Sequence, residues 1–408
     1  MVKDGNGVLI TRVTDLQIVN GAQTTASLAT ALRDKKLPEG NVYVPVKLSV
    51  VSPEAAEELI PLISRYANSQ NAVRQSDFFA NHPFHRRVEE MSRRLLAPAT
   101  DGSQLQTHWY YERARGQYLN DQAGLTSSQK SKFVVMNPKM QVMTKTDLAK
   151  VETCFALLPD TACRGAEKAF IEFAKTITDL WKDERRRAEL TDEWFKSAVA
   201  RVILFRLTEK VVSGAEWYEG GYRAQIVAYA CARLARLASE VSDGGRLDYR
   251  RIWGLQGVNE VFKQQIDLTA ETMSHVLRSP PREGQNIGEW AKQQACRSTA
   301  TNTDVEIVKG FDEWVIDKET VRTERREQRA VGAVDDDLRA METVLQTSPQ
   351  VWTSLRDYAR ARRLLGPRDE AALSSACLER GRPPNENQAQ ALIALLKRAE
   401  DTGWTAPN

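Results

Sequence analysis

Three separate stretches of this chain carry the residue types that could bind a phosphate group or a nucleotide base. The first spans residues 16–25 (LQIVNGAQTT), where an apolar run ends at Asn20-Gly21 and a polar pair, Gln23-Thr24, opens a segment with helical spacing. Asn and Gly tolerate the left-handed backbone that a tight turn often needs, and Thr24 can cap the first N–H groups of the helix. We therefore predict a strand, a turn and a helix whose positive N-terminus is a candidate anion site; the alternative is the same corner without a ligand.

The second stretch, residues 66–81 (YANSQNAVRQSDFFAN), contains four uncharged polar residues in succession. Side-chain amides both donate and accept hydrogen bonds, so Asn68, Gln70 and Asn71 suit base edges and phosphates. The alternative is a solvated loop that is closed by bonds between these side chains and the backbone.

The third stretch, residues 107–120 (THWYYERARGQYLN), interleaves aromatic and charged side chains. Arginines among aromatics can hold phosphates and stack on bases, which makes Arg113 and Arg115, together with Gln117, candidates for the same site. The same composition also makes an ordinary strand that carries a packed arginine stem and a salt bridge.

Metal-dependent chemistry would require acidic groups near these stretches, because carboxylates hold Mg²⁺. Glu112 and Asp147 are the best-placed acids. His82 and His85 have a spacing that a metal could use, but no cysteine lies near them in the sequence, and we expect no metal site there. The chain has no phosphate-cradling G-x-x-x-x-G-K-[ST] loop, no G-x-S-x-G elbow and no paired-histidine zinc motif. The sequence therefore identifies no cofactor, and Mg²⁺ is an option only for a nuclease.

The composition is ordinarily globular, and 408 residues are enough for two or three domains. The 57 basic and 54 acidic residues leave a net charge of only +3, so any basic surface must be local. Five scattered cysteines without a C-x-x-C pair argue for a reducing compartment and against disulfides. Because no signal peptide and no apolar run of membrane-spanning length is present, we expect a cytoplasmic protein without a membrane partner.

The surrounding elements that must position the three stretches have their own signals. Residues 41–51 (NVYVPVKLSVV) alternate like a strand, and Pro45 restricts that strand to an edge or a bulge. After residue 138 most of the chain has helical spacing, interrupted by a linker at residues 279–284. Residues 334–337 (VDDD) indicate the start of another helix, because acids are common near the positive helix end.

From these signals we predict an α+β fold, in which a small mixed β-sheet domain precedes a large and predominantly α-helical domain. The predicted divisions are a mixed α/β domain over residues 1–143, a helical domain over residues 144–300, and a helical C-terminal region over residues 301–408.

With the three polar stretches in view, the chain resembles the AIPR family, the abortive-infection phage-resistance proteins of bacteria. The resemblance covers about residues 10–300 and includes four further motifs in order: TKTDLAK at 144–150, GAEKAFIEF at 165–173, YRAQIVAYACARL at 222–234 and GEWAKQQAC at 288–296. It implies a cytosolic antiviral role, often beside restriction-modification genes, and supplies no reaction.

Family members usually carry a long N-terminal region with an Asn-Asn-Gly-Ile-type motif, which this chain lacks. The resemblance therefore implies that an N-terminal partner chain or a longer reading frame completes the site, and restriction-modification components are the other expected partners. More distantly, residues 18–25 are similar to the Asp-Gly-Gln-Gln-Arg turn of ParB-like proteins. Asn20 stands where that family has the acid and Thr24 where it has the arginine, so the charged pair used there is missing here.

We therefore interpret the chain as an anti-phage defence protein that recognises nucleic acid or nucleotide at a polar pocket. One wall would come from residues 20–24 and the opposite wall from residues 68–71, while Arg113 and Arg115 would neutralise phosphate. Two alternatives stay open. One is a metal-dependent nuclease or nucleotide hydrolase, and the other is a non-enzymatic scaffold that binds a phage or host protein through the helical half.

Overall fold

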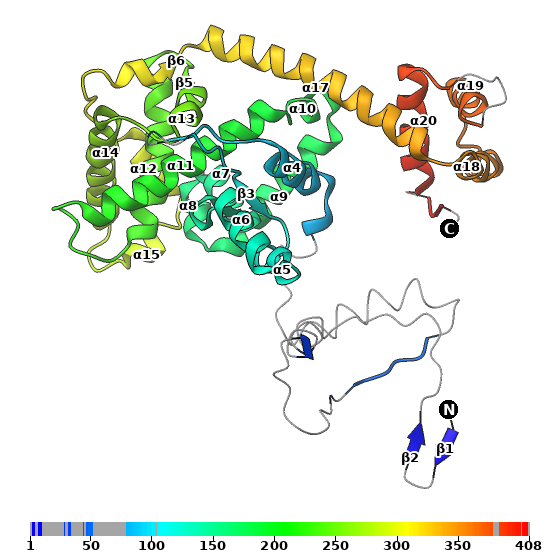
Figure 1. Cartoon of the computed structure of the whole chain (residues 1–408). Coiled ribbons are helices and arrows are strands. Elements are labelled where there is room, and N and C mark those ends of the chain that lie inside the picture. Colours follow the sequence, from blue (N-terminus) through cyan, green and yellow to red (C-terminus); the bar gives the residue numbers. More distant parts are fainter. Residues whose placement is uncertain are drawn as a thin grey trace.

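A computed structural model describes residues 79–406 apart from 101, 103, 378–382 and 401. It also describes residues 2–4, 7–9, 28, 32–33, 44 and 46–51 nearer the N-terminus. This part of the chain is predominantly helical, as predicted (Figure 1). The first set of helices is α4 (Pro83–Arg94), α5 (Gln117–Ala123), α6 (Ser127–Met136), α7 (Lys145–Phe155), α8 (Pro159–Cys163), α9 (Ala166–Lys182), α10 (Glu184–Arg187), α11 (Asp192–Gly214) and α12 (Arg223–Val241). The second set is α13 (Tyr249–Leu255), α14 (Glu260–Arg278), α15 (Ile287–Trp290), α16 (Gln294–Asn302), α17 (Lys318–Gln346), α18 (Pro349–Ala361), α19 (Pro367–Ala376) and α20 (Glu386–Glu400). Short 3₁₀ turns are η1 (Phe79–Asn81), η2 (Lys139–Gln141) and η3 (Phe311–Trp314).

The strands that the structure describes are short and form three separate pairs. These pairs are β1 (Val2–Asp4) with β2 (Gly7–Leu9), antiparallel; β3 (Tyr110–Glu112) with β4 (Val142–Thr144), parallel; and β5 (Arg246–Leu247) with β6 (Val315–Ile316), antiparallel. The mixed sheet over residues 1–143 therefore stays a prediction, because most of residues 1–78 lie outside the described part.

The predicted strand at residues 41–51 is wrong for the residues that can be compared. Residues 44 and 46–51 have no strand pairing, and all of them except Val51 are exposed. Alternation of apolar residues fixes which side chains share a face, but a strand exists only where a neighbouring backbone accepts its hydrogen bonds.

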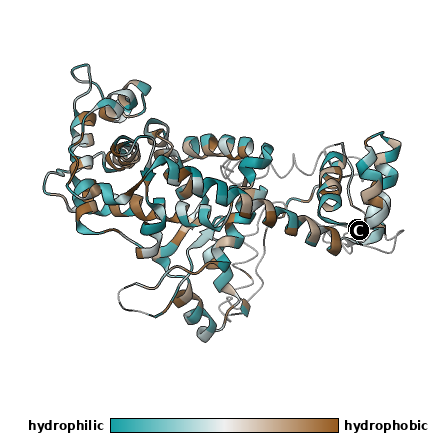
Figure 2. Ribbon diagram, turned by 90° about the horizontal axis from the view of Figure 1, so that it is seen from above, coloured by the Kyte–Doolittle hydropathy of each residue, from teal (hydrophilic) through white to brown (hydrophobic). Residues whose placement is uncertain are grey.

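Local capping explains where several helices begin. Thr144 and Asp147 form a reciprocal capping box at the start of α7, and Thr126 and Gln129 do the same for α6. Figure 2 shows hydrophobic and hydrophilic stretches alternating along most helices, as expected for helices with one buried face. Within the described residues, no helix combines the length and the apolar character that crossing a bilayer requires.

The helical body, from α4 to η3, is organised around one apolar core. Its fully buried members come from elements far apart in the sequence, for example Phe84, Tyr111, Leu204 and Phe262. Residues on both sides of position 143 belong to this core. The domain boundary that we predicted at residue 143 stays a prediction. The five cysteines are free thiols in this structure.

Helix α17 leaves this body and leads to a second core, which we call the C-terminal unit. Figure 1 shows α17 as the long helix between the body and the group formed by α18, α19 and α20. The second core contains the fully buried side chains of Trp352, Leu355, Leu373 and Leu392, and the end of α17 adds Val344.

The predicted helix start at residues 334–337 is wrong, because this segment lies inside α17. The helix begins at the cap Asp317, whose carboxylate accepts the N–H of Thr320 at 2.7 Å. Asp336 instead faces the body and forms ion pairs with Arg87 at 2.6 Å and Arg187 at 3.6 Å. Asp336 thus stands where other helices provide basic partners, which local sequence does not reveal.

Candidate functional site

The third polar stretch forms β3, a turn and helix α5. Gly116, which precedes α5, has a φ of 79°, a conformation that a side chain would strain. The carboxylate of Glu112 turns back to accept the N–H of Gly116 at 2.7 Å and that of Tyr118 at 3.4 Å. Glu112 therefore satisfies N–H groups at the start of α5 that would otherwise lack a partner.

Glu89 on α4 is the centre of a half-buried polar cluster, which we call the Glu89 cluster. Its carboxylate accepts a hydrogen bond from Arg113 Nε at 2.8 Å and another from the amide of Gln117. Arg93 Nη2 lies 3.6 Å from the same carboxylate. The oxygen of the Gln117 amide accepts the N–H groups of Arg113 at 3.2 Å and Ala114 at 3.3 Å. Two of the three predicted ligand residues of this stretch thus bond to the protein itself.

Arg113 also joins the second and third polar stretches. Its Nη1 donates to the carbonyl oxygen of Ala80 at 3.1 Å, and Ala80 belongs to the end of the second stretch. The two stretches, separated by more than two dozen residues, therefore meet beside Glu89.

A stacked layer holds β3 against α4. The guanidinium carbon of Arg93 lies 3.5 Å from the ring centroid of Tyr110, and Arg93 Nη2 donates to the carbonyl of Tyr111 at 3.1 Å. The hydroxyl of Tyr110 donates to Asp121. Burial, reinforced by this hydrogen bond, raises the pKa of Tyr110, and burial lowers the pKa of Arg93. These contacts give the Glu89 cluster a rigid support.

His85 lies beneath this layer and is fully buried. Its Nδ1 is 2.6 Å from the hydroxyl of Tyr111, and its ring stacks between Tyr111 and Phe170. Burial is the main cause that lowers the pKa of His85 to about 3, so the imidazole is neutral at pH 7. His82 caps α4, because its Nδ1 accepts the N–H of Phe84 at 3.2 Å.

Of the remaining predicted site residues, the structure describes Asp147 and Arg115 but not the others. Asp147 belongs to the capping box of α7, and Arg115 is exposed on the turn before α5. Seven residues lie outside the described part of the chain: Asn20, Gly21, Gln23, Thr24, Asn68, Gln70 and Asn71. The convergence of Gln23 and Asn71 with Arg113 therefore stays a prediction.

Among the residues that the structure describes, Glu112 and Asp147 belong to no acidic cluster that could hold a metal. No group of three or more His, Cys, Asp or Glu side chains with metal-binding geometry occurs among the described residues. Both predicted acids use their carboxylates to hold the first turn of a helix.

The sequence interpretation missed Glu89, the residue that organises the cluster. Its spacing of four from Arg93 on one helix was the only local signal, and such pairs are common on exposed helix faces. Its contacts to Arg113 and Gln117 span 24 and 28 residues and depend on the packing of α4 against β3.

Comparison with known proteins gives one result. A family model described as AIPR protein matches residues 2–281, which is more than half of the chain. No curated protein and no solved structure gives a significant match. The chain therefore belongs to the AIPR protein family, whose members act in the abortive-infection response of bacteria to phage.

Proposed function

We propose that this AIPR protein contributes to phage defence by recognising nucleic acid or a nucleotide at a polar site beside the Glu89 cluster. The observation that carries the proposal is the hydrogen bond from Arg113 to the carbonyl of Ala80, which brings two of the three polar stretches together. Asn68, Gln70 and Asn71 precede Ala80 by about a dozen residues or fewer in the chain. A segment of that length is long enough to reach the Glu89 cluster.

The two arginines of the third stretch have different roles in this proposal. Arg113 is bound to Glu89, whose charge offsets its own, so it positions the two stretches. Arg115 is exposed and makes no ion pair with any residue that the structure describes, so its guanidinium can face a phosphate. The N–H groups at the start of α5 are already bonded to Glu112 and are not the phosphate-binding groups.

The test compares binding of the full chain to single-stranded DNA, duplex DNA and ATP over a range of salt concentrations. Arg115→Ala should weaken binding and reduce the slope of log affinity against log salt by about one, because one phosphate contact is lost. Arg115→Lys should restore the slope but only part of the affinity, since an ammonium lacks the bidentate fork.

The matched control is Arg185→Ala, which removes another exposed arginine, on α10, away from the Glu89 cluster. It should leave both affinity and salt slope unchanged. Equal effects of the two substitutions, or no binding of any of the three probes, would contradict the proposal. Parallel runs with Mg²⁺ and with EDTA distinguish recognition from cleavage of the probe.

A further inference from the structure

Helix α17 carries a row of apolar side chains that the described part of the chain leaves mostly exposed. The row, which we call the α17 stripe, consists of Val331, Val334, Leu338, Met341 and Leu345. Val331, Val334, Leu338 and Leu345 are 55, 58, 61 and 62% exposed, and Met341 packs partly against the second core. The steps between them alternate three and four residues, the spacing of a helix–helix seam, over a length of about 21 Å.

A different face of α17 makes the contacts within the chain. Gly332 and Asp336 face the helical body, and Ala340 and Val344 belong to the second core. Apart from Met341, the stripe therefore lies outside the face by which α17 packs in the described structure. A contiguous exposed apolar row of this kind is typical of an interaction surface.

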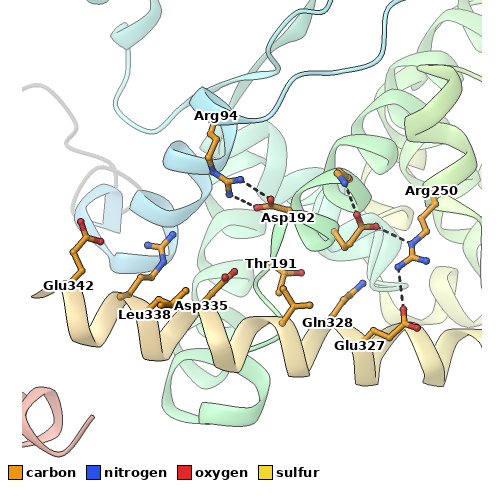
Figure 3. A pocket seen from close by; sticks show the side chains of 13 residues that line it. Arg94, Thr191, Asp192, Arg250, Glu327, Gln328, Asp335, Leu338 and Glu342 are labelled. Carbon is orange, nitrogen blue, oxygen red and sulfur yellow. Dashed lines mark hydrogen bonds and ion pairs between the residues drawn. The ribbon is translucent and has the colours of Figure 1, made fainter. Parts of the chain in front are cut away.

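A cleft runs beside the stripe. It has a volume of ≈ 560 Å³ and lies between α17 and the start of α11, with Val331 and Leu338 among its lining residues (Figure 3). Figure 3 shows Leu338, Asp335 and Glu342 along α17 and the pair Arg94–Asp192 on the opposite side. The cleft gives room for the side chains of a second helix laid along the stripe.

The charges around the cleft are unequally neutralised. Basic groups on its walls are paired: Arg94 with Asp192 at 2.5 Å, Lys196 with Glu193 at 2.6 Å and Arg339 with Glu90 at 2.8 Å. Asp335 and Glu342, which flank the stripe, have no ion pair with any residue that the structure describes. The cleft therefore offers an apolar row with two carboxylates beside it, whereas each basic side chain that lines it already has an acidic partner.

We propose that the α17 stripe is the docking site for an amphipathic helix of a partner protein, with lysines or arginines beside its own apolar row. Recognition of a helix in a groove uses this combination of apolar anchors and complementary flanking charges. A second copy of this chain fits less well, because its own α17 would bring Asp335, Asp337 and Glu342 against the same carboxylates.

The test uses three labelled helical peptides of about three heptads. The first has leucine at the seam positions and lysine beside them, the second replaces lysine with glutamate, and the third replaces leucine with serine. Fluorescence anisotropy with the full-length chain should show binding of the first peptide and much weaker binding of the other two.

Variants of the chain locate the site. Val334→Ser with Leu338→Ser should lower affinity for the first peptide about tenfold or more, as loss of central apolar anchors does. The control Leu255→Ser removes a leucine that is 55% exposed on α13, and it should change nothing. Asp335→Lys with Glu342→Lys should reverse the preference, so that the glutamate peptide binds more tightly than the lysine peptide. Circular dichroism confirms that each variant is folded.

Three results would overturn the proposal. The first is equal binding of the leucine and serine peptides, and the second is an unchanged preference after charge reversal. The third is a stable dimer of the full chain in sedimentation that Leu338→Ser dissociates, which would assign the stripe to a second copy. All three readouts are independent of nucleic-acid binding.

Discussion

The helical body and the C-terminal unit are each held by an apolar core, but α17 is held to the body mainly by charge. The second core contains Trp352 and Leu392, both fully buried, and needs no contribution from the body. Between α17 and the body the described residues form several ion pairs, including Arg87–Asp336 at 2.6 Å and Arg329–Glu189 at 2.6 Å, and one close backbone approach at Gly332. Apolar burial is nearly insensitive to salt, whereas ion pairs near the surface are screened. We therefore expect salt concentration to affect the attachment of α17 to the body more than it affects either apolar core.

The close approach of α17 to the body has one steric requirement. A Cβ added to Gly332 would lie 1.7 Å from the carbonyl oxygen of Ala188. The glycine thus permits a backbone contact that ion pairs alone would not produce, and it fixes the register in which Asp336 meets Arg87.

The largest effect on stability is expected from removing a buried tryptophan, which tests whether the two cores unfold separately. Trp352→Ala should destabilise the C-terminal unit by about 3–5 kcal/mol, because a fully buried tryptophan leaves a large cavity. Differential scanning calorimetry should show an earlier transition for this unit, with the body transition unchanged. Trp314→Ala, which empties a site in the first core, should move the body transition instead. A single transition that shifts equally in both variants would mean that the two cores unfold as one.

Removing the central ion pair should loosen α17 without emptying either core. Asp336→Asn leaves Arg87, whose side chain is 7% exposed, without its carboxylate, and should destabilise the docked helix by about 2–4 kcal/mol. Hydrogen exchange should rise in the first half of α17, while α18 to α20 keep their protection. The neighbouring Asp335→Asn, which removes an acid without an ion pair among the described residues, should behave as the wild type. If both variants exchange alike, charge pairing does not hold α17.

Pushing α17 away from the body with an added methyl group should have a somewhat smaller effect on stability. Gly332→Ala forces α17 away from Ala188 and should cost about 1–3 kcal/mol of docking stability. Limited proteolysis between residues 318 and 346 reports the change. The control Gly254→Ala, in a helix where an added Cβ meets nothing within 4 Å, should be neutral or stabilising by about 0.4–1 kcal/mol. Unchanged protease resistance of Gly332→Ala would show that the contact relaxes at no cost.

Lowering the pH should reduce the stability of the helical body before that of the C-terminal unit. The pKa of His85 is lowered to about 3, mainly by burial and further by the charges of His82, Lys145 and Arg113. Between this pKa and the unfolded value of about 6.5 the unfolded chain binds the extra proton, so stability falls as pH falls through that window. From pH 7 to pH 5.5 the loss should be about 1 kcal/mol.

Chemical unfolding at several pH values measures this slope, and His85→Phe provides the comparison. The variant should lose the His85 contribution and show a flatter dependence between pH 7 and pH 5.5. A slope identical to that of the wild type would assign the acid sensitivity to other groups.

Several features of the fold depend only on residues that are neighbours along the chain, and these features can be predicted from the sequence. The start of α7 follows from Thr144 and Asp147, which bond reciprocally three residues apart, and the break before α12 follows from Gly220 and Gly221, both with positive φ. Capping and backbone permissiveness act within one turn, so short sequence windows contain the necessary information. Periodicity likewise predicted a mostly helical chain after residue 138, which the structure confirms.

The partners of the charged residues, in contrast, depend on how distant segments pack together. Arg113 bonds to Glu89 and Ala80, and Asp336 bonds to Arg87 from a position 249 residues away. The sequence suggested a phosphate ligand in the first case and a helix start in the second, because an arginine or an aspartate suits several partners equally well. Which partner it meets depends on how helices pack, and packing is fixed by apolar contacts between segments far apart in the chain. The same reason explains residues 41–51, whose alternation is a local property, whereas the partner strand that it requires is not.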